Sequence, residues 1–272
     1  MDLEALSEVA KRAALAAGKV IRQHVNNDIV VEQKAGGTSR ASQVVTAVDR
    51  AAESAIFSHI LPTCQTNSIA LLSEETEDDG SRLVQDYFWC IDPLDGTLAF
   101  IKQYPGFSVS VALVARDGTP QIGVVYDPST DTLYHAIKGQ GAFRNQQPWS
   151  VAATNQHLTY VTDRSLADTP RAAEIEAFLR QKVKQLKVNG TQELNGTGAV
   201  LGAIRVLEND PACMLKFPKT ERGGGSVWDY AATACIYREL GLRATNFAGG
   251  PLNLNPAGDT FMHREGVFFA NW

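Results

Sequence analysis

The sequence predicts an α/β protein, and three observations lead to this fold class. Apolar residues recur at three- and four-residue spacing near the N-terminus, which is typical of an amphipathic helix. Residues 68–138 hold five short apolar runs separated by turn residues, which indicates a largely antiparallel sheet. After residue 150, helix and strand patterns alternate. The 272 residues suffice for one large domain or for two closely packed subdomains.

Two helices are predicted in the first quarter of the chain. The first begins at Leu3 and ends near Asn26, because its apolar residues fall on one helical face. The second runs from about Asp49 to Ile60. Pro62 is expected to end it, because proline has no N–H group with which to continue the hydrogen-bond ladder.

The segment between these helices, VEQKAGGTSRASQ at residues 31–43, is predicted to be a mobile loop because it is polar and contains glycine. Lys34 in this loop is a candidate for contact with a ligand. Solvation alone would explain the same composition, so both interpretations stay open.

Five strands are predicted from the runs SIALLSEE, YFWCIDP, FSVSVALVAR, PQIGVVYD and TLYHAIK. Turn signals such as Asp117-Gly118 and Asp127-Pro128 separate them, so the strands are expected to form a meander. In the second half, the repeated motif NGTQELNGTG at residues 189–198 is expected to form two turns. The other elements expected there are strands at TYVTD and ACMLKF and helices near residues 171–186, 198–208 and 226–240, the last closed by Gly241.

Composition excludes several classes of protein. The net charge is -5 and there is no basic run, which argues against a groove for DNA or RNA. No segment approaches the roughly eighteen uninterrupted apolar residues of a membrane helix. The N-terminus lacks the pattern of a signal peptide, so a cytoplasmic protein is expected.

The spacing of the cysteines and histidines argues against a zinc site. The four cysteines form no C-x-x-C pair and the five histidines form no H-x-x-x-H pair. Reduced, buried thiols are the expected state of the cysteines. If a metal binds, oxygen atoms must hold it, which points to Mg²⁺ rather than Zn²⁺.

Three acidic features lie where a scaffold can hold side chains in fixed geometry, at the ends of apolar strands or at the start of an apolar helix. They are Glu74-Glu75 after IALL, Asp92 with Asp95 in IDPLDGT, and Asp229 in GGGSVWDYAATA. Taken singly, each has an ordinary explanation: a solvated acidic loop, an Asp-Gly turn, or an acid favoured by the helix dipole.

Asp92 is harder to explain as a turn residue, because it directly continues the apolar run FWCI. A desolvated carboxylate is costly unless it is paired, hydrogen-bonded or bound to a metal. Pro93 stiffens the turn between Asp92 and Asp95. These two carboxylates, with the Leu94 carbonyl between them, can flank two hard divalent cations, as two-metal phosphoryl chemistry requires.

Gly96 and Thr97 follow directly and form a candidate phosphate site. Glycine lets a ligand approach the backbone, and a helix beginning here would present free amides to an anion. The spacing D-x-x-D-G-T differs from the D-x-D-x-T motif of haloacid dehalogenase-type enzymes. Water, rather than a side chain, is therefore the expected attacker.

Four motifs along the chain match one known family in order. They are VTAVDRAAE at residues 45–53, SEE at 73–75, IDPLDGT at 91–97 and VWDYAA at 227–232. Together they resemble the signature of the inositol monophosphatase superfamily of magnesium-dependent, lithium-sensitive phosphatases. The resemblance spans nearly the whole chain and implies a layered α-β-α-β-α sandwich of the sugar phosphatase and inositol monophosphatase type.

The resemblance implies a role for each acid. Glu74, Asp92 and the Leu94 carbonyl would hold one Mg²⁺ ion. Asp92, Asp95 and Asp229 would hold a second, and family members often show a third, weaker ion near Glu74. Residues 1–150 would then form an α+β subdomain that carries most of the metal ligands. Residues 151–272 would form an α/β subdomain that supplies Asp229 and substrate contacts.

The resemblance also implies the catalytic residues. The amides of Gly96 and Thr97 would hold the phosphate. Thr97 with Asp49 would orient the attacking water and help to deprotonate it, so Asp49, Thr97 and the metal-binding Glu74 are the catalytic candidates. Glu75 lies beside them in the sequence and would support the ligands or contact the substrate.

Two segments suggest a branch of the family. FIK at residues 100–102 and VTDRSL at 161–166 are more similar to the bacterial 3'(2'),5'-bisphosphate nucleotidases of the CysQ type. The expected reaction is therefore hydrolysis of 3'-phosphoadenosine 5'-phosphate to AMP. Inositol-1-monophosphatase activity is the alternative, although inositol phosphatases carry a glutamate where this chain has Arg222. A third hypothesis is a homologue that binds a phosphorylated metabolite without catalysis; a homodimer is usual for the family.

Overall fold

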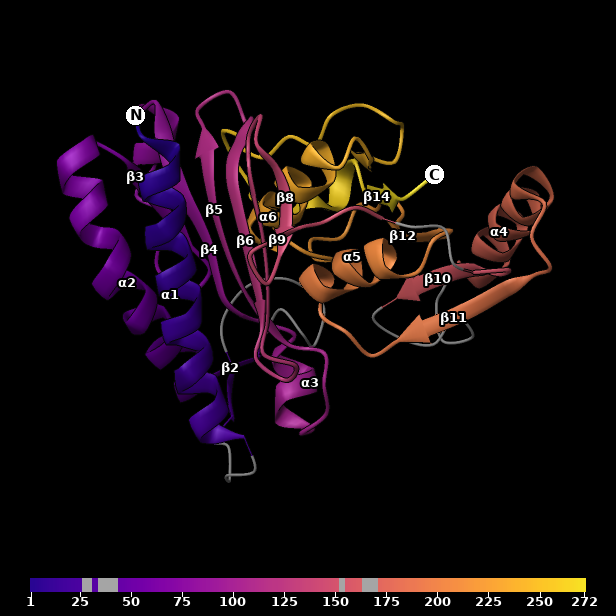
Figure 1. The fold of residues 1–272 in the computed structure, drawn as a ribbon, viewed down its shortest axis with the longest axis horizontal. Coiled ribbons are helices and arrows are strands. Elements are labelled where there is room, and N and C mark those ends of the chain that lie inside the picture. The colour runs from indigo at the N-terminus through magenta and orange to yellow at the C-terminus, as the bar shows by residue number, and fades with distance from the viewer. Residues whose placement is uncertain (26–30, 34–43, 152–154, 163–170) are drawn as a thin grey trace.

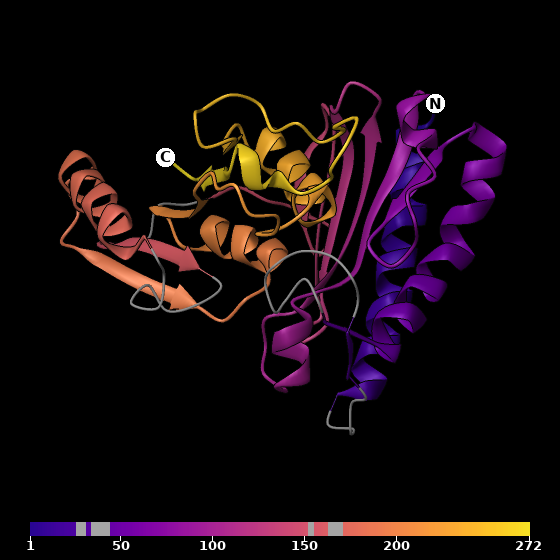
Figure 2. The ribbon, with the colours of Figure 1, turned by 180° about the vertical axis from the view of Figure 1, so that it is seen from behind.

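The structure is a computed structural model that describes residues 1–25, 31–33, 44–151, 155–162 and 171–272. Its helices and sheets stack in five layers, which Figures 1 and 2 show from two sides. A helix pair covers one face of a seven-stranded sheet, and a second helix pair separates this sheet from a five-stranded sheet. Another helix covers the far face of the five-stranded sheet. The predicted α-β-α-β-α sandwich is confirmed.

The first layer consists of α1 (Leu3–His24) and α2 (Ala47–Asn67), which pack against each other and on the seven-stranded sheet. The Asp2 side chain accepts a hydrogen bond from the Ala5 amide (3.0 Å) and so caps α1. The apolar stripe predicted for this helix faces the core. Leu3 and Val20 are half-buried, and the other members are buried: Leu6, Ala10, Ala13, Ala17 and Ile21.

Helix α2 does not end before Pro62, so that prediction is wrong. The helix continues through Pro62 to Asn67. The Trp89 indole N–H, from the neighbouring sheet, donates a hydrogen bond to the Thr63 hydroxyl (2.9 Å). Packing of this last part of α2 on the sheet thus offsets the hydrogen bond that proline cannot donate.

The seven-stranded sheet follows chain order from β3 to β9, and its pairs are antiparallel except for the parallel pair of β3 and β4. The predicted meander is confirmed. Both faces are buried: on β4, Trp89 and Ile91 face the α1 and α2 layer, and Phe88 and Cys90 face the inner helices. The strands are β3 (Ala70–Ser73), β4 (Tyr87–Asp95), β5 (Ser108–Ala115), β6 (Pro120–Asp127), β7 (Thr132–Ile137), β8 (Gly141–Arg144) and β9 (Gln147–Pro148).

The second half of the chain forms the other three layers. The three helices predicted in this half are present. Helices α5 (Ala199–Glu208) and α6 (Val227–Glu239) lie between the sheets, and α4 (Ala172–Leu186) covers the outer face. None of the helices in the described ranges is long and apolar enough to cross a membrane. The five-stranded sheet contains, in spatial order, β11 (Thr191–Asn195), β10 (Leu158–Thr162), β12 (Ala212–Lys216), β14 (Val267–Ala270) and β13 (Arg243–Thr245).

The segment at residues 189–198 does not form two turns. Residues 191–195 form the edge strand β11, which pairs in parallel with β10. The two Asn-Gly pairs lie at the ends of this strand, so the turn signals mark its limits. Pairing with β10 outweighs the polar composition between them.

The predicted loop at residues 31–43 is partly wrong. Its first residues form β1 (Val31–Gln33), which pairs antiparallel with β2 (Val44–Thr46). Residues 34–43, and with them Lys34, lie outside the described residues. The other short elements in the described ranges are α3 (Thr97–Ile101) and the 3₁₀ turns Ser81–Leu83 and Met262–Arg264.

One core joins the two sheets. A single buried cluster contains Val125 of the seven-stranded sheet, Val161 of the five-stranded sheet and Ala203 between them. Since the sheets share this core, the division into subdomains 1–150 and 151–272 stays a prediction.

A row of small residues lets α6 approach the seven-stranded sheet closely. Ala112, Gly123, Ala136 and Ala142 lie opposite one another across β5 to β8. A Cβ atom at Gly123 would lie 2.2 Å from the carbonyl oxygen of Ala232 in α6. The backbone of α6 therefore rests on the sheet, which positions the first turn of this helix relative to β4.

We expect Gly123→Ala to lower the free energy of unfolding by about 1–3 kcal/mol, because the added methyl group overlaps the backbone of α6. Urea denaturation would measure this loss. Gly258→Ala is the matched control, since Gly258 is exposed and its added Cβ would meet no atom within 4 Å beyond the neighbouring residues. Equal stabilities of the two variants would contradict the close approach.

Candidate active site

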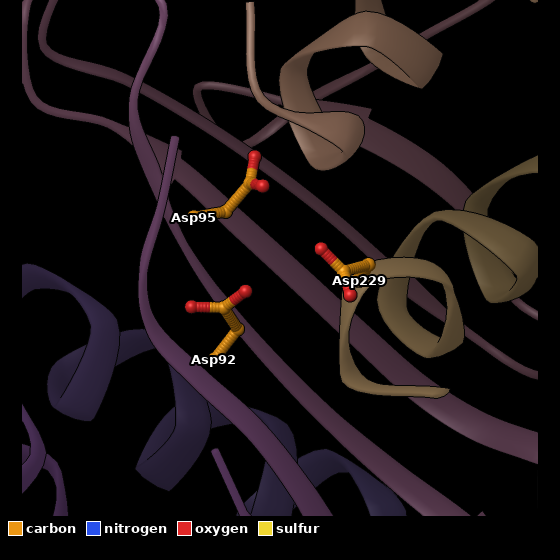
Figure 3. A group of neighbouring side chains, drawn as sticks. All are labelled: Asp92, Asp95 and Asp229. Carbon is orange, nitrogen blue, oxygen red and sulfur yellow. The ribbon is translucent and has the colours of Figure 1, made fainter. Parts of the chain in front are cut away.

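Strand β4 carries two acids at its end, and a β-bulge places them on the same side. Side chains three residues apart on a regular strand point to opposite faces. Here Asp92 pairs with Ser110 of β5 and Asp95 pairs with Ser108, so β4 has one residue more than β5 over this stretch. This extra residue, in the segment that contains Pro93, turns both carboxylates toward α6 (Figure 3).

Asp229 reaches the same place from the first turn of α6. The Ser226 amide donates a hydrogen bond to Asp229 Oδ2 (2.6 Å), so the carboxylate also caps its own helix. One carboxylate oxygen each from Asp92, Asp95 and Asp229 lies within 4.8 Å of the others. Figure 3 shows the three side chains converging on one space from β4 and α6.

Asp95 also joins β4 to α5. Its Oδ1 accepts a hydrogen bond from the Ala199 amide (3.0 Å), and its Oδ2 accepts one from the Val200 amide (3.0 Å). Gly198 precedes these residues, and a Cβ atom there would lie 2.2 Å from Asp95 Oδ2. Sequence reasoning missed these three partners, although a glycine directly before the apolar helix 199–208 was an available signal.

Burial and mutual repulsion disfavour charge on these carboxylates. Burial first, and then the charges of Glu74, Asp95 and Asp229, raise the pKa of Asp92 well above its usual range. Burial and the charge of Asp229 raise the pKa of Asp95 to about 7, although the Val200 and Ala199 amides act in the opposite direction. A divalent cation would relieve this repulsion, and an all-oxygen donor set suits a hard ion.

Glu74 and Glu75 follow β3 directly and are both half-buried, so they are not part of a fully solvated loop. The Glu74 amide donates to the Ile91 carbonyl (3.1 Å), which places Glu74 one strand away from Asp92. Among the described residues, the group within 4.8 Å consists of the three aspartates, so Glu74 lies at its edge. The charge of Glu74 still acts on Asp92.

Glu53 of α2 supports the segment that carries these glutamates. Its carboxylate accepts hydrogen bonds from the Ser73 hydroxyl (2.5 Å) and the Thr76 hydroxyl (3.0 Å), which lie on either side of Glu74-Glu75. Glu53 is buried. Sequence reasoning did not assign it a role, although it is the last residue of the motif VTAVDRAAE.

Thr97 and Asp49 meet at the beginning of α3. The Thr97 hydroxyl lies 3.2 Å from Asp49 Oδ1 and 3.1 Å from the Leu94 carbonyl oxygen. Because a hydroxyl has one proton, it donates to one of these acceptors at a time. Gly96, just before the helix, has φ = +81°, a conformation that favours glycine. A Cβ atom there would also lie 2.4 Å from the Gly106 carbonyl oxygen.

Comparisons with known proteins agree with these features. The sequence profile of the inositol monophosphatase family matches residues 2–271. Inositol-1-monophosphatase from Synechocystis sp. is 33% identical over 93% of this chain and 83% of the relative, and that from Bacillus subtilis is 27% identical over 98% and 92%. The structure of CysQ from Bacteroides thetaiotaomicron matches with a TM-score of 0.76 and 26% identity, over 98% of this chain and 97% of that chain. The chain therefore belongs to the inositol monophosphatase family of phosphatases, which hydrolyse phosphomonoesters.

Proposed function

We propose that this phosphatase uses Mg²⁺ and an activated water molecule to hydrolyse 3'-phosphoadenosine 5'-phosphate to AMP. The observation that carries the chemistry is the group of two buried acids, Asp92 and Asp95, and the half-buried Asp229, each with one carboxylate oxygen within 4.8 Å of the others. Three acids this close, two of them buried, would repel one another without a cation, so their convergence supports a role in metal binding.

The donor atoms fit Mg²⁺. They are carboxylate oxygens from Asp92, Asp95 and Asp229, joined in the proposal by Glu74 and the Leu94 carbonyl. No thiol or imidazole takes part in the acid group of the described chain, which disfavours Zn²⁺. When bound, Mg²⁺ supplies positive charge that polarises both the attacking water and the phosphate ester.

The Thr97 hydroxyl and the Asp49 carboxylate are the groups proposed to orient the attacking water. With its proton on Asp49, Thr97 can accept a hydrogen bond from a water molecule and so direct the water's lone pair toward phosphorus. Asp49 is 1% exposed, so its carboxylate is held away from bulk solvent. The amides of Gly96 and Thr97 are proposed to bind the phosphate oxygens.

Separate observations support two candidate substrates. The segments FIK and VTDRSL favour the bisphosphate nucleotide, and CysQ is among the structural neighbours. The sequence relatives from Synechocystis and Bacillus are named inositol-1-monophosphatases, so inositol 1-phosphate is the second candidate. The resemblance also leads us to expect inhibition by Li⁺ with either substrate.

A phosphate-release assay tests the proposal. Inositol 1-phosphate, fructose 1,6-bisphosphate and 3'-phosphoadenosine 5'-phosphate would be compared in Mg²⁺ and in chelator, and the nucleotide should have the highest kcat/KM.

Asp92→Asn should lower kcat by at least about a hundredfold, because it removes a shared metal ligand while keeping the acceptor for the Leu94 amide. Normal turnover of this folded variant in saturating Mg²⁺ would refute the metal assignment. No Mg²⁺-dependent release from any ester would favour a non-catalytic binding protein.

The role of Thr97 can be separated from substrate binding. Thr97→Ala should lower kcat by about a hundredfold or more and leave KM nearly unchanged, because the hydroxyl orients water in the transition state. Thr97→Ser keeps the hydroxyl and should retain most of the turnover. An increase in KM alone would show that Thr97 binds substrate instead.

Stabilisation by Mg²⁺ should depend on pH. The pKa of Asp95 is raised in the folded protein to about 7, so without metal the folded state holds a proton that it loses as pH rises through that value. The metal-free fold therefore loses stability as pH rises from about 4, the pKa of an unfolded aspartate, to about 7, and this loss is complete above that value. Mg²⁺ must displace the proton at low pH but not at high pH.

Thermal unfolding with Mg²⁺ and with chelator checks this linkage. At about pH 8, saturating Mg²⁺ should raise the Tm by about 5 °C, and at about pH 5 the rise should be much smaller. Asp92→Asn is the control and should show little Mg²⁺ effect at either pH. Equal shifts of the wild-type protein at both pH values would argue against binding at these carboxylates.

A further inference from the structure

A cavity of about 460 Å³ adjoins the acid group. It lies between the ends of β10 and β12, the start of α5 and the segments 216–224 and 262–267. Gly198 and Ala199 line it, and the same two residues contact the carboxylate of Asp95. The volume is that of a small-molecule site, so a substrate with its phosphate at the acid group can extend into this cavity.

The cavity wall combines apolar and cationic side chains. Met214, Phe217 and Val267 contribute apolar surface. Among the described lining residues, the ionisable side chains other than tyrosine are Arg171, Lys216, Lys219, Glu221 and His263. Cations outnumber carboxylates on this described part of the wall, although the whole chain is acidic.

Arg171 is already balanced by a carboxylate. Its guanidinium forms two hydrogen bonds with Glu174 (2.8 and 2.5 Å) and stacks on the Phe217 ring at 3.8 Å. It therefore contributes a flat surface at the cavity more than an unneutralised charge.

Lys219 and His263 are held next to each other on this wall. The Lys219 amide donates to the His263 carbonyl (2.8 Å). The Lys219 ammonium lies 4.0 Å from where a Cβ of Gly224 would stand, so it lies over the glycine segment of the wall. Glu221 is nearby. The pKa of its carboxyl is held below the usual range, first by hydrogen bonds with its own backbone and with Thr220, and then by the charges of Lys219 and His263.

His263 is the buried ionisable group, other than tyrosine, of the described wall. It is 5% exposed, and its Nδ1 has no hydrogen-bond partner among the described residues. Buried polar atoms are nearly always paired, so this ring nitrogen is a hydrogen-bonding group without a protein partner beside the cavity.

We propose that Lys219 and His263 bind a second anionic group of the substrate, attached to a flat ring that packs on the apolar wall. This inference rests on the proposed function, because it extends the substrate from the acid group into the cavity. An uncharged polyol would match neither the cations nor the apolar surface. Lys219 and His263 would therefore make the site favour a bisphosphate nucleotide over the phosphate of an uncharged polyol.

Binding of the reaction product tests the anion site without catalysis. Adenosine 5'-phosphate and adenosine would be titrated by calorimetry into the metal-free protein in chelator, since they differ only in the second anionic group. The phosphate should tighten binding by at least about tenfold in the wild-type protein, and Lys219→Ala should lose about tenfold of this gain. Lys138→Ala, an exposed lysine away from the cavity, removes the same charge and should bind as the wild type does.

The variant His263→Leu removes the ring nitrogen and should also weaken binding of adenosine 5'-phosphate, with adenosine unaffected. Its folding would be checked by thermal unfolding. Lys219 is exposed, so the test does not depend on the folding of the histidine variant. Equal affinity of the wild-type protein for adenosine and its 5'-phosphate, or equal loss in Lys219→Ala and Lys138→Ala, would overturn the proposal.

Kinetics separate this inference from the proposed function. With Mg²⁺, kcat/KM should be at least about tenfold higher for 3'-phosphoadenosine 5'-phosphate than for adenosine 3'-phosphate, through KM, and Lys219→Ala should remove this difference. Phosphate release from both esters at equal kcat/KM would refute the anion site while leaving the phosphatase intact. Phosphate release from neither would refute the proposed function, and the calorimetry would still decide the anion site.

Discussion

The structure depends on keeping three carboxylates, two of them buried, close together although they repel one another. Asp92 and Asp95 come from one strand, and only the extra residue of the bulge lets side chains three apart face the same way. Asp229 comes from a helix that would stand further away without the row of small residues on the sheet. Backbone amides bound to these carboxylates offset part of the repulsion, and the packing of the surrounding layers keeps the three acids in place.

The layers around the site differ in how freely their residues can change. The seven-stranded sheet, buried on both faces, carries the acids of β4 on a scaffold with little freedom to move. The inner helices α5 and α6 begin at the acid group, so their N-terminal turns face it. The five-stranded sheet adds the cavity wall through strand ends and connecting segments, where residues can change without disturbing the acids.

The sequence predicted elements with strong local patterns and missed those that depend on distant partners. The periodic helices and the meander were found, because their burial repeats along the chain. Pro62 misled the prediction for α2, since contacts such as that between Trp89 and Thr63 cannot be seen locally. Strands β13 and β14 were not predicted, because three or four residues carry too little pattern. The acids were found from their motifs, whereas the bulge that aligns them and the α5 amides that bind Asp95 are products of the fold.

The bonds between Asp95 and the first amides of α5 have a practical consequence for anyone who wants an inactive form that traps its substrate. Replacing Asp95 would also uncap a helix whose start lines the neighbouring cavity, so the trapped complex would report a rearranged pocket. Asp92 accepts its hydrogen bond from Leu94 within the same turn, so its loss should stay local. Asp92 is therefore a better position than Asp95 for a substitution that removes activity and leaves the cavity unchanged.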